Sequence, residues 1–499
     1  MKRWRLFFLL MVAGPAQLSN AQTLYHEIYR PQIHFSPKEK WMNDPNGMVY
    51  YQGIYHLFFQ YYPDSTVWGP MHWGHATSKD LIHWQQQTIA LYPDSLGYIF
   101  SGSAVVDENN TSGFGKNGQV PLVAIFTQHD PVGEKQHNNI FQNQSIAYSL
   151  DAGQTWIKYA GNPVLKNPGI TDFRDPKLMW YAPQNKWIMT LATKDRVTFY
   201  SSHDLKSWTK ESEFGKDIGA HGGVWECPDL ISFDDNGKSV WALIVSINPG
   251  GPNGGSATQY FIGDFDGKNF TPFSTKTKWI DYGPDNYAGV TWYNTGKRKI
   301  FLGWMTNWTY AQKVPTKTWR SAMTVPRELI LKHVGNDVFL AAQPVEELGK
   351  ITTGKKTFQN ISVDDLSKKI NYISLPCRID VSLISEDFSM IIANDAGEEI
   401  MVGYDKKQNR YFIDRTKSGK IDFQKDFAGK HTAPKIAQAE DIKISIIADM
   451  SSIELFADDG LTVMTETYFP SNPYDKISVQ SPGNLSLTKF TYSMLNTIW

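Results

Sequence analysis

The chain has 499 residues, which exceeds one ordinary hydrophobic core and predicts two domains or one large β architecture. Its 49 basic and 50 acidic side chains nearly cancel, so the chain lacks the single-sign field that accompanies binding to nucleic acid or to an anionic membrane. Aromatic residues make up 14% of the chain, and this content favours a neutral partner whose apolar faces stack on exposed rings.

The first 21 residues predict an export signal. MKRWR is a basic head, LFFLLMVAG is a short apolar run, and SNA before Gln22 offers a cleavage site. No cysteine follows the run, so no lipid anchor is predicted, and the run is too short to span a bilayer. We therefore expect a mature chain that begins at Gln22 and is exported, to the periplasm or the cell exterior, without a membrane anchor.

Residues 22–345 read as nearly all β. Short alternating runs such as GMVYYQGIYHLFFQY and VWALIVSI end at Gly, Asn, Asp or Pro, as strands do. A turn-like pattern also recurs, in TSKDLIHW, SLDAGQTW, SSHDLKSW and GDFDGKNF. This recurrence predicts one such turn per blade of a β-propeller, and the alternative is a chance recurrence of hairpin turns.

The composition changes near residue 345, which predicts a domain boundary. The polar passage AAQPVEELGKITTGKK separates a Trp- and Gly-rich region from a Lys-, Ile- and Ser-rich region. Residues 346–499 contain alternating runs such as YISLPCRIDVSLI and DIKISIIADMSSIELFADDG, which are typical of a two-sheet β-sandwich. The chain as a whole is therefore predicted to be all-β.

The sequence indicates neither a disulfide framework, nor a metal site, nor a cofactor. Cys227 and Cys377 are far apart in sequence, and we expect two unpaired buried thiols. His72 and His75 in MHWGH would lie on different faces of a strand, and no carboxylate completes a ligand set. The Gly-rich GPNGGS lies in a β-rich region and does not lead from a strand into a helix. No obligate protein partner is implied.

Three acids occur in similar settings. Asp44 lies in WMNDPNG, Asp175 in FRDPK and Glu226 in WECPD, each close to an aromatic residue and a proline. Taken alone, Asp-Pro-Asn-Gly is ordinary turn chemistry, and the Arg-Asp pair of FRDPK has an alternative as a surface ion pair. Loops from different blades converge on a propeller's axis, however, and two carboxylates that face one bond can cleave a glycoside. We expect the three acids to meet there.

In that order, the three motifs resemble the signature motifs of glycoside hydrolase family 32, the fructan hydrolases and invertases. The resemblance extends through FSGSA, INPGGPNGGSATQYFIGDFDG and LGWMTNWTYAQKVPTKTWRSAMTVPREL, and it reaches DRTKSG and ELFADDG in the C-terminal region. It implies a five-bladed β-propeller catalytic domain over residues 22–345, followed by a β-sandwich domain over residues 346–499. The number five comes from the resemblance and not from the spacing.

The resemblance also implies a role for each acid in a retaining mechanism. Asp44 would be the nucleophile, held ionised by donors such as Asn43 or backbone amides. Glu226 would be the general acid and then the general base, so it must carry its proton at the start of the reaction. Asp175 would bind sugar hydroxyls and stabilise the transition state, with Arg174 donating charge-assisted hydrogen bonds to the bound sugar.

The pocket that the resemblance implies for a terminal fructose comprises Asn43, Gln60, Trp68, Phe100, Ser101, Arg174 and Trp304. For the three aromatic residues the alternative is ordinary packing in the core. The implied substrates are levan, inulin and sucrose, shortened by one terminal β-D-fructosyl unit at a time. Endo cleavage, transfructosylation and a noncatalytic fructan-binding propeller are the alternatives, and the sandwich domain is either a structural buttress or a second carbohydrate-binding part.

Overall fold

The computed structural model describes residues 24–499, and most of this part is strand. The all-β prediction is confirmed: within the described residues the helices are α1 (Pro131–Lys135), α2 (Val363–Lys369) and the 3-10 turns η1 (Ala182–Gln184) and η2 (Glu346–Ile351). The predicted export signal lies outside the described residues. Across residues 24–499, no helix is long and apolar enough to cross a membrane.

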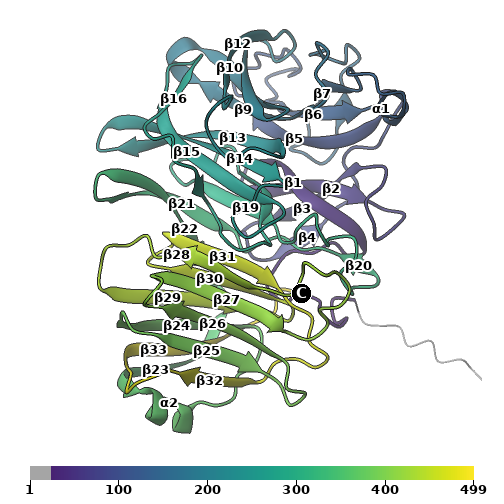
Figure 1. Ribbon diagram of the computed structural model, residues 1–499. Coiled ribbons are helices and arrows are strands. Elements are labelled where there is room, and N and C mark those ends of the chain that lie inside the picture. Colours follow the sequence, from purple (N-terminus) through teal and green to yellow (C-terminus); the bar gives the residue numbers. More distant parts are fainter. Residues whose placement is uncertain (1–23) are drawn as a thin grey trace, which may run out of the picture.

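The part of the chain up to Pro344 forms five sheets of four or five strands, and Figure 1 shows them in the upper half of the molecule. The first sheet contains β1 (Lys40–Tyr51), β2 (Ile54–Tyr62), β3 (His72–Ser78), β4 (Trp84–Gln86) and the late strand β20 (Trp319–Arg320). The second contains β5 (Tyr98–Val106), β6 (Leu122–His129), β7 (Gln142–Ser149) and β8 (Ile157–Lys158), and the third β9 (Phe173–Tyr181), β10 (Lys186–Thr193), β11 (Arg196–Ser202) and β12 (Thr209–Phe214). The fourth contains β13 (Val224–Asp235), β14 (Lys238–Asn248), β15 (Ala257–Phe265), β16 (Phe270–Pro272) and β17 (Lys278–Trp279), and the fifth β18 (Tyr287–Thr291), β19 (Ile300–Trp304), β21 (Arg327–Val334) and β22 (Asp337–Pro344).

The first strand of each sheet packs against the first strand of the next. β1 contacts β5, β5 contacts β9, β9 contacts β13, β13 contacts β18, and β18 contacts β1. Four sheets are antiparallel, whereas the first also takes up β20, which pairs with β1 in parallel. The first strands are therefore the ones that meet in the middle of this part of the molecule.

The recurring turn of the sequence joins the third and fourth strands in each of the first four sheets. In the first sheet, the Asp80 carboxylate accepts hydrogen bonds from the backbone N–H groups of Ile82 and His83. Asp204 does the same for two backbone N–H groups in the third sheet. An aspartate side chain that mimics a backbone turn explains why the pattern needs Asp at this point.

Residues 352–495 form two sheets that pack face to face, in the lower half of Figure 1. One contains β23 (Thr352–Ser362), β24 (Cys377–Ile384), β29 (Asp441–Ala448), β30 (Ser452–Ala457), β31 (Thr462–Thr467) and β33 (Ser486–Leu495). The other contains β25 (Phe388–Ala393), β26 (Glu399–Asp405), β27 (Arg410–Lys417), β28 (Lys430–Pro434) and β32 (Lys476–Gln480). Strand β24 alternates buried and partly buried residues, as one wall of a sandwich should.

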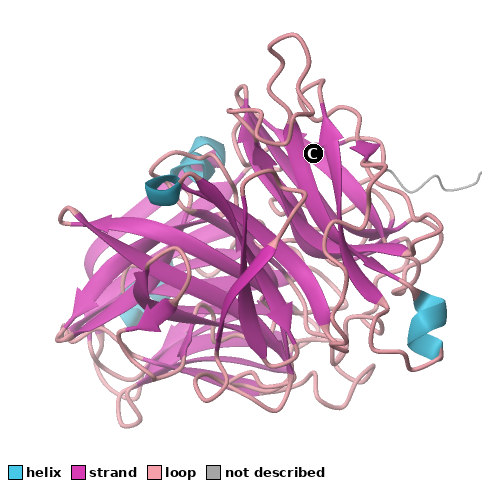
Figure 2. Cartoon of the chain, turned by 90° about the horizontal axis from the view of Figure 1, so that it is seen from above, coloured by secondary structure: helices cyan, strands magenta, loops and turns pink. Residues whose placement is uncertain are grey.

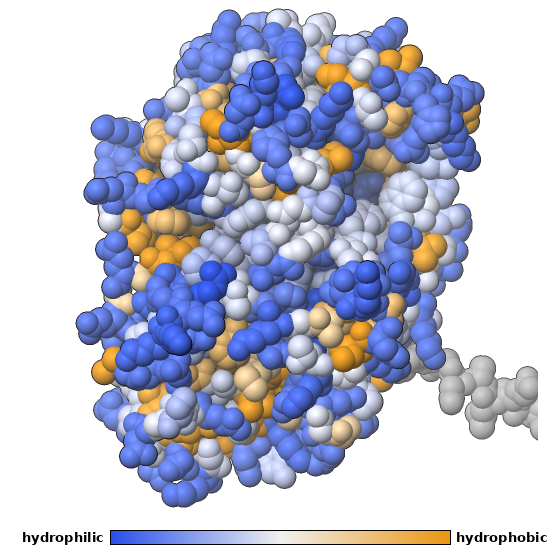
Figure 3. Space-filling view, in the orientation of Figure 1, coloured by the Kyte–Doolittle hydropathy of each residue, from blue (hydrophilic) through white to orange (hydrophobic). Residues whose placement is uncertain are grey.

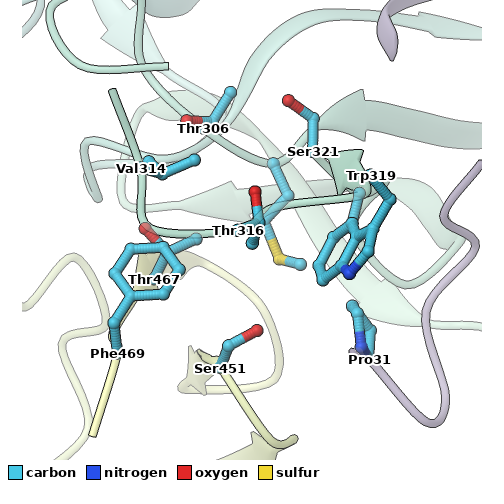
Figure 4. A pocket seen from close by; sticks show the side chains of 11 residues that line it. Pro31, Thr306, Val314, Thr316, Trp319, Ser321, Ser451, Thr467 and Phe469 are labelled. Carbon is cyan, nitrogen blue, oxygen red and sulfur yellow. The ribbon is translucent and has the colours of Figure 1, made fainter. Parts of the chain in front are cut away.

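Buried charged side chains join the two parts, and a small crevice lies at the boundary between them. Arg327 has no exposed surface and lies between Asp281 of the first part and Glu454 of the sandwich. Figure 4 shows the crevice nearby, where side chains of the segment 305–322 meet Ser451 and Phe469 of the sandwich. Seen from above, the molecule consists almost entirely of strands and loops, and the few short helices lie near its edge (Figure 2). The face drawn in Figure 3 is mainly hydrophilic, with hydrophobic residues in small groups.

Candidate active site

The three acids of the sequence motifs all lie on first strands, at irregular points of the ladder. Register shifts fall between Met42 and Pro45 on β1 and between Glu226 and Asp229 on β13, and the ladder of β9 is interrupted at Asp175. Asp175 has a φ of 64°, in the left-handed region that non-glycine residues rarely adopt. Such bulges re-aim side chains beside functional sites.

Asp44 accepts hydrogen bonds at both carboxylate oxygens. Asn43 Nδ2 donates to Oδ1 over 3.0 Å, and Ser101 Oγ donates to Oδ2 over 2.6 Å. Asn43 is itself held, because Trp41 Nε1 donates to its Oδ1 over 2.8 Å. Two neighbouring donors favour the ionised form of Asp44, as the sequence analysis anticipated for Asn43.

Asp175 and Glu226 are linked through Arg174. The guanidinium donates to Glu226 Oε1 from Nε over 3.2 Å and from Nη2 over 3.0 Å, and its Nε lies 4.0 Å from Asp175 Oδ2. Asp172 holds the other end of the guanidinium in an ion pair. The Arg-Asp pair of FRDPK is therefore not a surface pair: Asp175 is 5% exposed and shares its arginine with a second acid.

Cys227 joins the remaining two acids. Its backbone N–H donates to Asp175 Oδ2 over 3.0 Å, and its thiol lies 3.7 Å from both Asp175 Oδ2 and Asp44 Oδ2. Cys377 is also free and buried, so the prediction of two unpaired buried thiols is confirmed. The three acids thus lie around one small space, as expected from their positions on different sheets.

Burial, and secondarily the neighbouring carboxylates, raise the pKa values of Asp44 and Asp175. Burial, together with the charges of Glu226 and Asp44, raises the pKa of Asp175 to about 7, although Arg174 opposes the shift. Burial and the charge of Glu226 also raise the pKa of Asp44, against the hydrogen bonds from Ser101 and Asn43. Strongly shifted carboxyl groups that cluster in this way are typical of functional sites.

The residues expected to form a pocket differ in exposure. Trp68 is 37% exposed and meets half-buried Phe100 edge to face, with ring centroids 6.0 Å apart. Gln60 is buried, and its Nε2 donates to Asn46 Oδ1 and to the backbone of Ile99. The structure therefore brings Ser101 into contact with Asp44, and Phe100, the residue before Ser101, into contact with Trp68.

Trp304 has no exposed surface, so it cannot touch a sugar in this conformation. Its Nε1 donates to the backbone oxygen of Met42, and its ring packs against Trp41 and Trp308. Trp308 is only partly buried and stacks on Trp41 with centroids 6.0 Å apart. Trp304 consequently supports the segment before Asp44, and Trp308 is the only partly exposed ring of these three.

Sequence reasoning missed Tyr287, which donates from its hydroxyl to Glu226 Oε2. Tyr287 begins β18, the first strand of the fifth sheet, and it is 1% exposed. Its surrounding sequence DNYAGVTW carries no turn or acid motif, so only the contact between sheets identifies it. Cys227 is predicted from the sequence only as an unpaired buried thiol, whereas its backbone N–H and thiol also contact two acids.

The paired histidines of MHWGH do not converge. His72 Nδ1 lies 2.9 Å from the backbone oxygen of Pro70, whereas His75 contacts His56 with ring nitrogens 3.1 Å apart. Within residues 24–499, no group of three His, Cys, Asp or Glu side chains could hold a metal ion.

Three acids held around one space by an arginine, a tyrosine and backbone donors define the class of carboxylate-dependent glycoside hydrolases. The chain matches "Glycosyl hydrolases family 32 N-terminal domain" over residues 34–344 and "Glycosyl hydrolases family 32 C terminal" over residues 346–494. The protein belongs to glycoside hydrolase family 32, and the resemblance of the three motifs is confirmed.

Relatives and solved structures cover nearly the whole chain. A levanase of Bacillus subtilis (strain 168) is 45% identical over 99% of this chain and 74% of its own length. An extracellular exo-inulinase of Aspergillus niger is 40% identical over 94% of this chain and 94% of its own. The crystal structure of exo-inulinase from Aspergillus awamori superposes with a TM-score of 0.87 at 37% identity, covering 95% of this chain and all of that one.

Proposed function

We propose that this enzyme is an exo-acting β-fructosidase that removes terminal fructosyl units from levan, inulin and sucrose. The observation that carries the proposal is the linked cluster of Asp44, Asp175 and Glu226 in a member of this family. The names of the related levanase and exo-inulinases support a fructan substrate and exo action. The related exo-inulinase of Aspergillus niger is named as extracellular, which supports export of this enzyme from the cell.

Asp44 is the proposed nucleophile that attacks the anomeric C2 of the terminal fructosyl unit. Two hydrogen bonds hold its carboxylate, and this preorganisation keeps it aimed at one point. Glu226 protonates the leaving oxygen and then activates water, and Arg174 with Tyr287 fixes its carboxyl group during both steps. Asp175 is close enough to share Arg174 and is the proposed stabiliser of positive charge that develops on the sugar ring.

We assign the terminal-fructose pocket to Asn43, Gln60, Trp68, Phe100, Ser101 and Arg174, with Trp304 supporting it from behind. For the fold, we infer that the five sheets are the five blades of a propeller and that the domain boundary lies at residue 345. Contacts between successive first strands, including β18 with β1, support this ring.

The test incubates the purified chain with levan, inulin and sucrose separately and resolves products by chromatography at low conversion. We expect fructose as the only early product from both polymers, and no product from an Asp44→Asn control. Early NMR spectra of the released sugar should show β-fructose first, because a covalent intermediate implies two inversions. Early oligosaccharides would indicate an endo cleft, α-fructose would reject the nucleophile, and an inactive parent would favour a noncatalytic fructan-binding propeller.

A further inference from the structure

A short hydrogen-bonded chain lies behind the proposed pocket wall at Phe100. The register of β5 shifts between Ile99 and Gly102, so Phe100 and Ser101 leave the regular ladder together. Ser101 donates to Asp44, while the Phe100 ring stands between the edge of Trp68 and the face of His129. The wall and the nucleophile's hydrogen bond therefore depend on the same two-residue bulge.

His129 supports the rear face of the Phe100 ring. It ends β6, is 2% exposed, and stacks on Phe100 with ring centroids 4.2 Å apart and planes 9° apart. The edge of Phe141 closes another side of the imidazole at 5.4 Å. A flat ring enclosed in this way leaves Phe100 little freedom to retreat from a bound sugar.

The hydrogen bonds of His129 fix the orientation of its imidazole. Gln142 Oε1 accepts from the backbone N–H of Phe173, so the amide nitrogen of Gln142 faces His129 Nδ1, 3.4 Å away, and donates to it. Nδ1 is therefore the acceptor, and Nε2 carries the proton that it donates to Glu134 Oε2 over 3.1 Å. This series of hydrogen bonds thus runs from β9, the strand that bears Asp175, to helix α1.

Burial favours this neutral form of His129. Burial is the largest influence and lowers the pKa of His129, and the charge of Arg174 acts in the same direction. Glu134 and Asp130 act in the opposite direction and do not reverse the shift. Glu134 is 54% exposed on its side chain, so α1 connects the buried ring to the solvent side of the wall.

We propose that His129 is a positioning residue: it holds the Phe100 ring against the terminal sugar, and its hydrogen bond to Glu134 couples helix α1 to sugar affinity. This inference rests on the proposed function, because it takes Phe100 as a pocket wall. A wall acts on bound substrate and transition state alike, so loss of its support should raise KM and leave kcat nearly unchanged.

The experiment is a double-mutant cycle on sucrose hydrolysis, with His129→Ala, Phe100→Ala and the double variant of the full chain. His129→Ala should raise KM roughly 5- to 10-fold with kcat nearly unchanged, the factor that one aromatic stacking contact supplies. In the Phe100→Ala background the same change should add nothing, because the supported ring is absent. His129→Phe, which keeps a flat ring, should recover most of the KM, and His83→Ala on an exposed turn is the matched control.

Equal effects of His129→Ala with and without Phe100 would overturn the inference, as would a fall in kcat alone. If His129→Ala does not fold, the exposed Glu134→Ala takes its place in the cycle, and a KM that rises roughly twofold only when Phe100 is present supports the coupling. A parent chain that hydrolyses neither sucrose nor fructan would reject the proposed function itself. If the parent is active but neither His129→Ala nor Glu134→Ala changes its KM, only the positioning role is rejected.

Discussion

At the residue scale, the site is organised by groups that carry no reaction chemistry of their own. Arg174 reaches Glu226 and Asp175 at once, and Tyr287 fixes the second oxygen of Glu226. Cys227 supplies a backbone donor to Asp175, and its own backbone takes a φ of 46° to do so. The strained main chain at this point lowers local stability and helps to orient two acids.

Loss of the Glu226 carboxylic acid should reduce the rate without unfolding the chain. Glu226→Gln keeps a similar shape and can still accept a hydrogen bond from Arg174, but it cannot donate a proton to the leaving group. We expect kcat to fall roughly 10²- to 10⁴-fold, the usual contribution of general acid catalysis. Initial rates on sucrose, together with an unchanged circular dichroism spectrum, check this, and undiminished activity would disprove the role.

Loss of the Arg174 charge should move the pH dependence. Arg174 lowers the pKa of Asp175, which burial and neighbouring acids otherwise raise to about 7. Arg174→Gln should therefore raise that pKa further, and the acid limb of the kcat/KM profile should shift to higher pH because Asp175 acts in its ionised form. Arg196→Gln, at an ion pair on the surface, is the control. A limb that stays in place or moves to lower pH would contradict the assignment.

At the scale of elements, stacked aromatic and imidazole rings join two neighbouring strands of the first sheet. His56 on β2 and His75 on β3 lie with ring nitrogens 3.1 Å apart, and Phe58 stacks on His75 at 4.3 Å. Both imidazoles are 4% exposed. Burial lowers the pKa of His56 to about 4 and that of His75 to about 3, so the folded state keeps both rings neutral.

This pair predicts a loss of stability in acid. Between pH 6.5 and about 4 the imidazoles bind protons in the unfolded chain but stay neutral in the folded one. The free energy of unfolding therefore falls as the pH falls. The loss is about 2.5 kcal/mol for each ring by pH 4.5. Urea titrations at pH 7.5 and 4.5 should show a smaller difference for His75→Gln than for the parent, whereas His83→Gln, at an exposed turn, should match the parent. An identical pH difference in all three would refute the explanation.

At the scale of the whole molecule, buried charges link the two parts. Arg327 pairs with Asp281 and Glu454, and His34 of the N-terminal segment contacts Glu454 and Asp449. These side chains have no exposed surface. A buried charge that loses its partner is strongly destabilising, because no water replaces the lost contact. The sandwich therefore supports the first part through an ion-pair network in which each member is needed.

Breaking this network should destabilise both parts together. Arg327→Ala leaves Asp281 and Glu454 buried without their shared cation, and we expect a loss of about 3–5 kcal/mol in the free energy of unfolding. Calorimetry should show one transition shifted to lower temperature for both parts. Arg378→Ala, at a half-exposed pair on the sandwich, should change it little. An unchanged transition, or a shift confined to one part, would contradict the link.

The sequence by itself determined the all-β class, and it predicted the change of domain near residue 345 and the three acids. These features are local: strand alternation, an aspartate that closes a turn, and short motifs such as FRDPK can be read without knowing what lies opposite. Only the tertiary structure decided that Tyr287 reaches Glu226, that Cys227 lies between two acids, and that Trp304 is buried while Trp308 is accessible. Those facts depend on side chains that meet between sheets, and no periodicity along one strand records which residue of another sheet will face it.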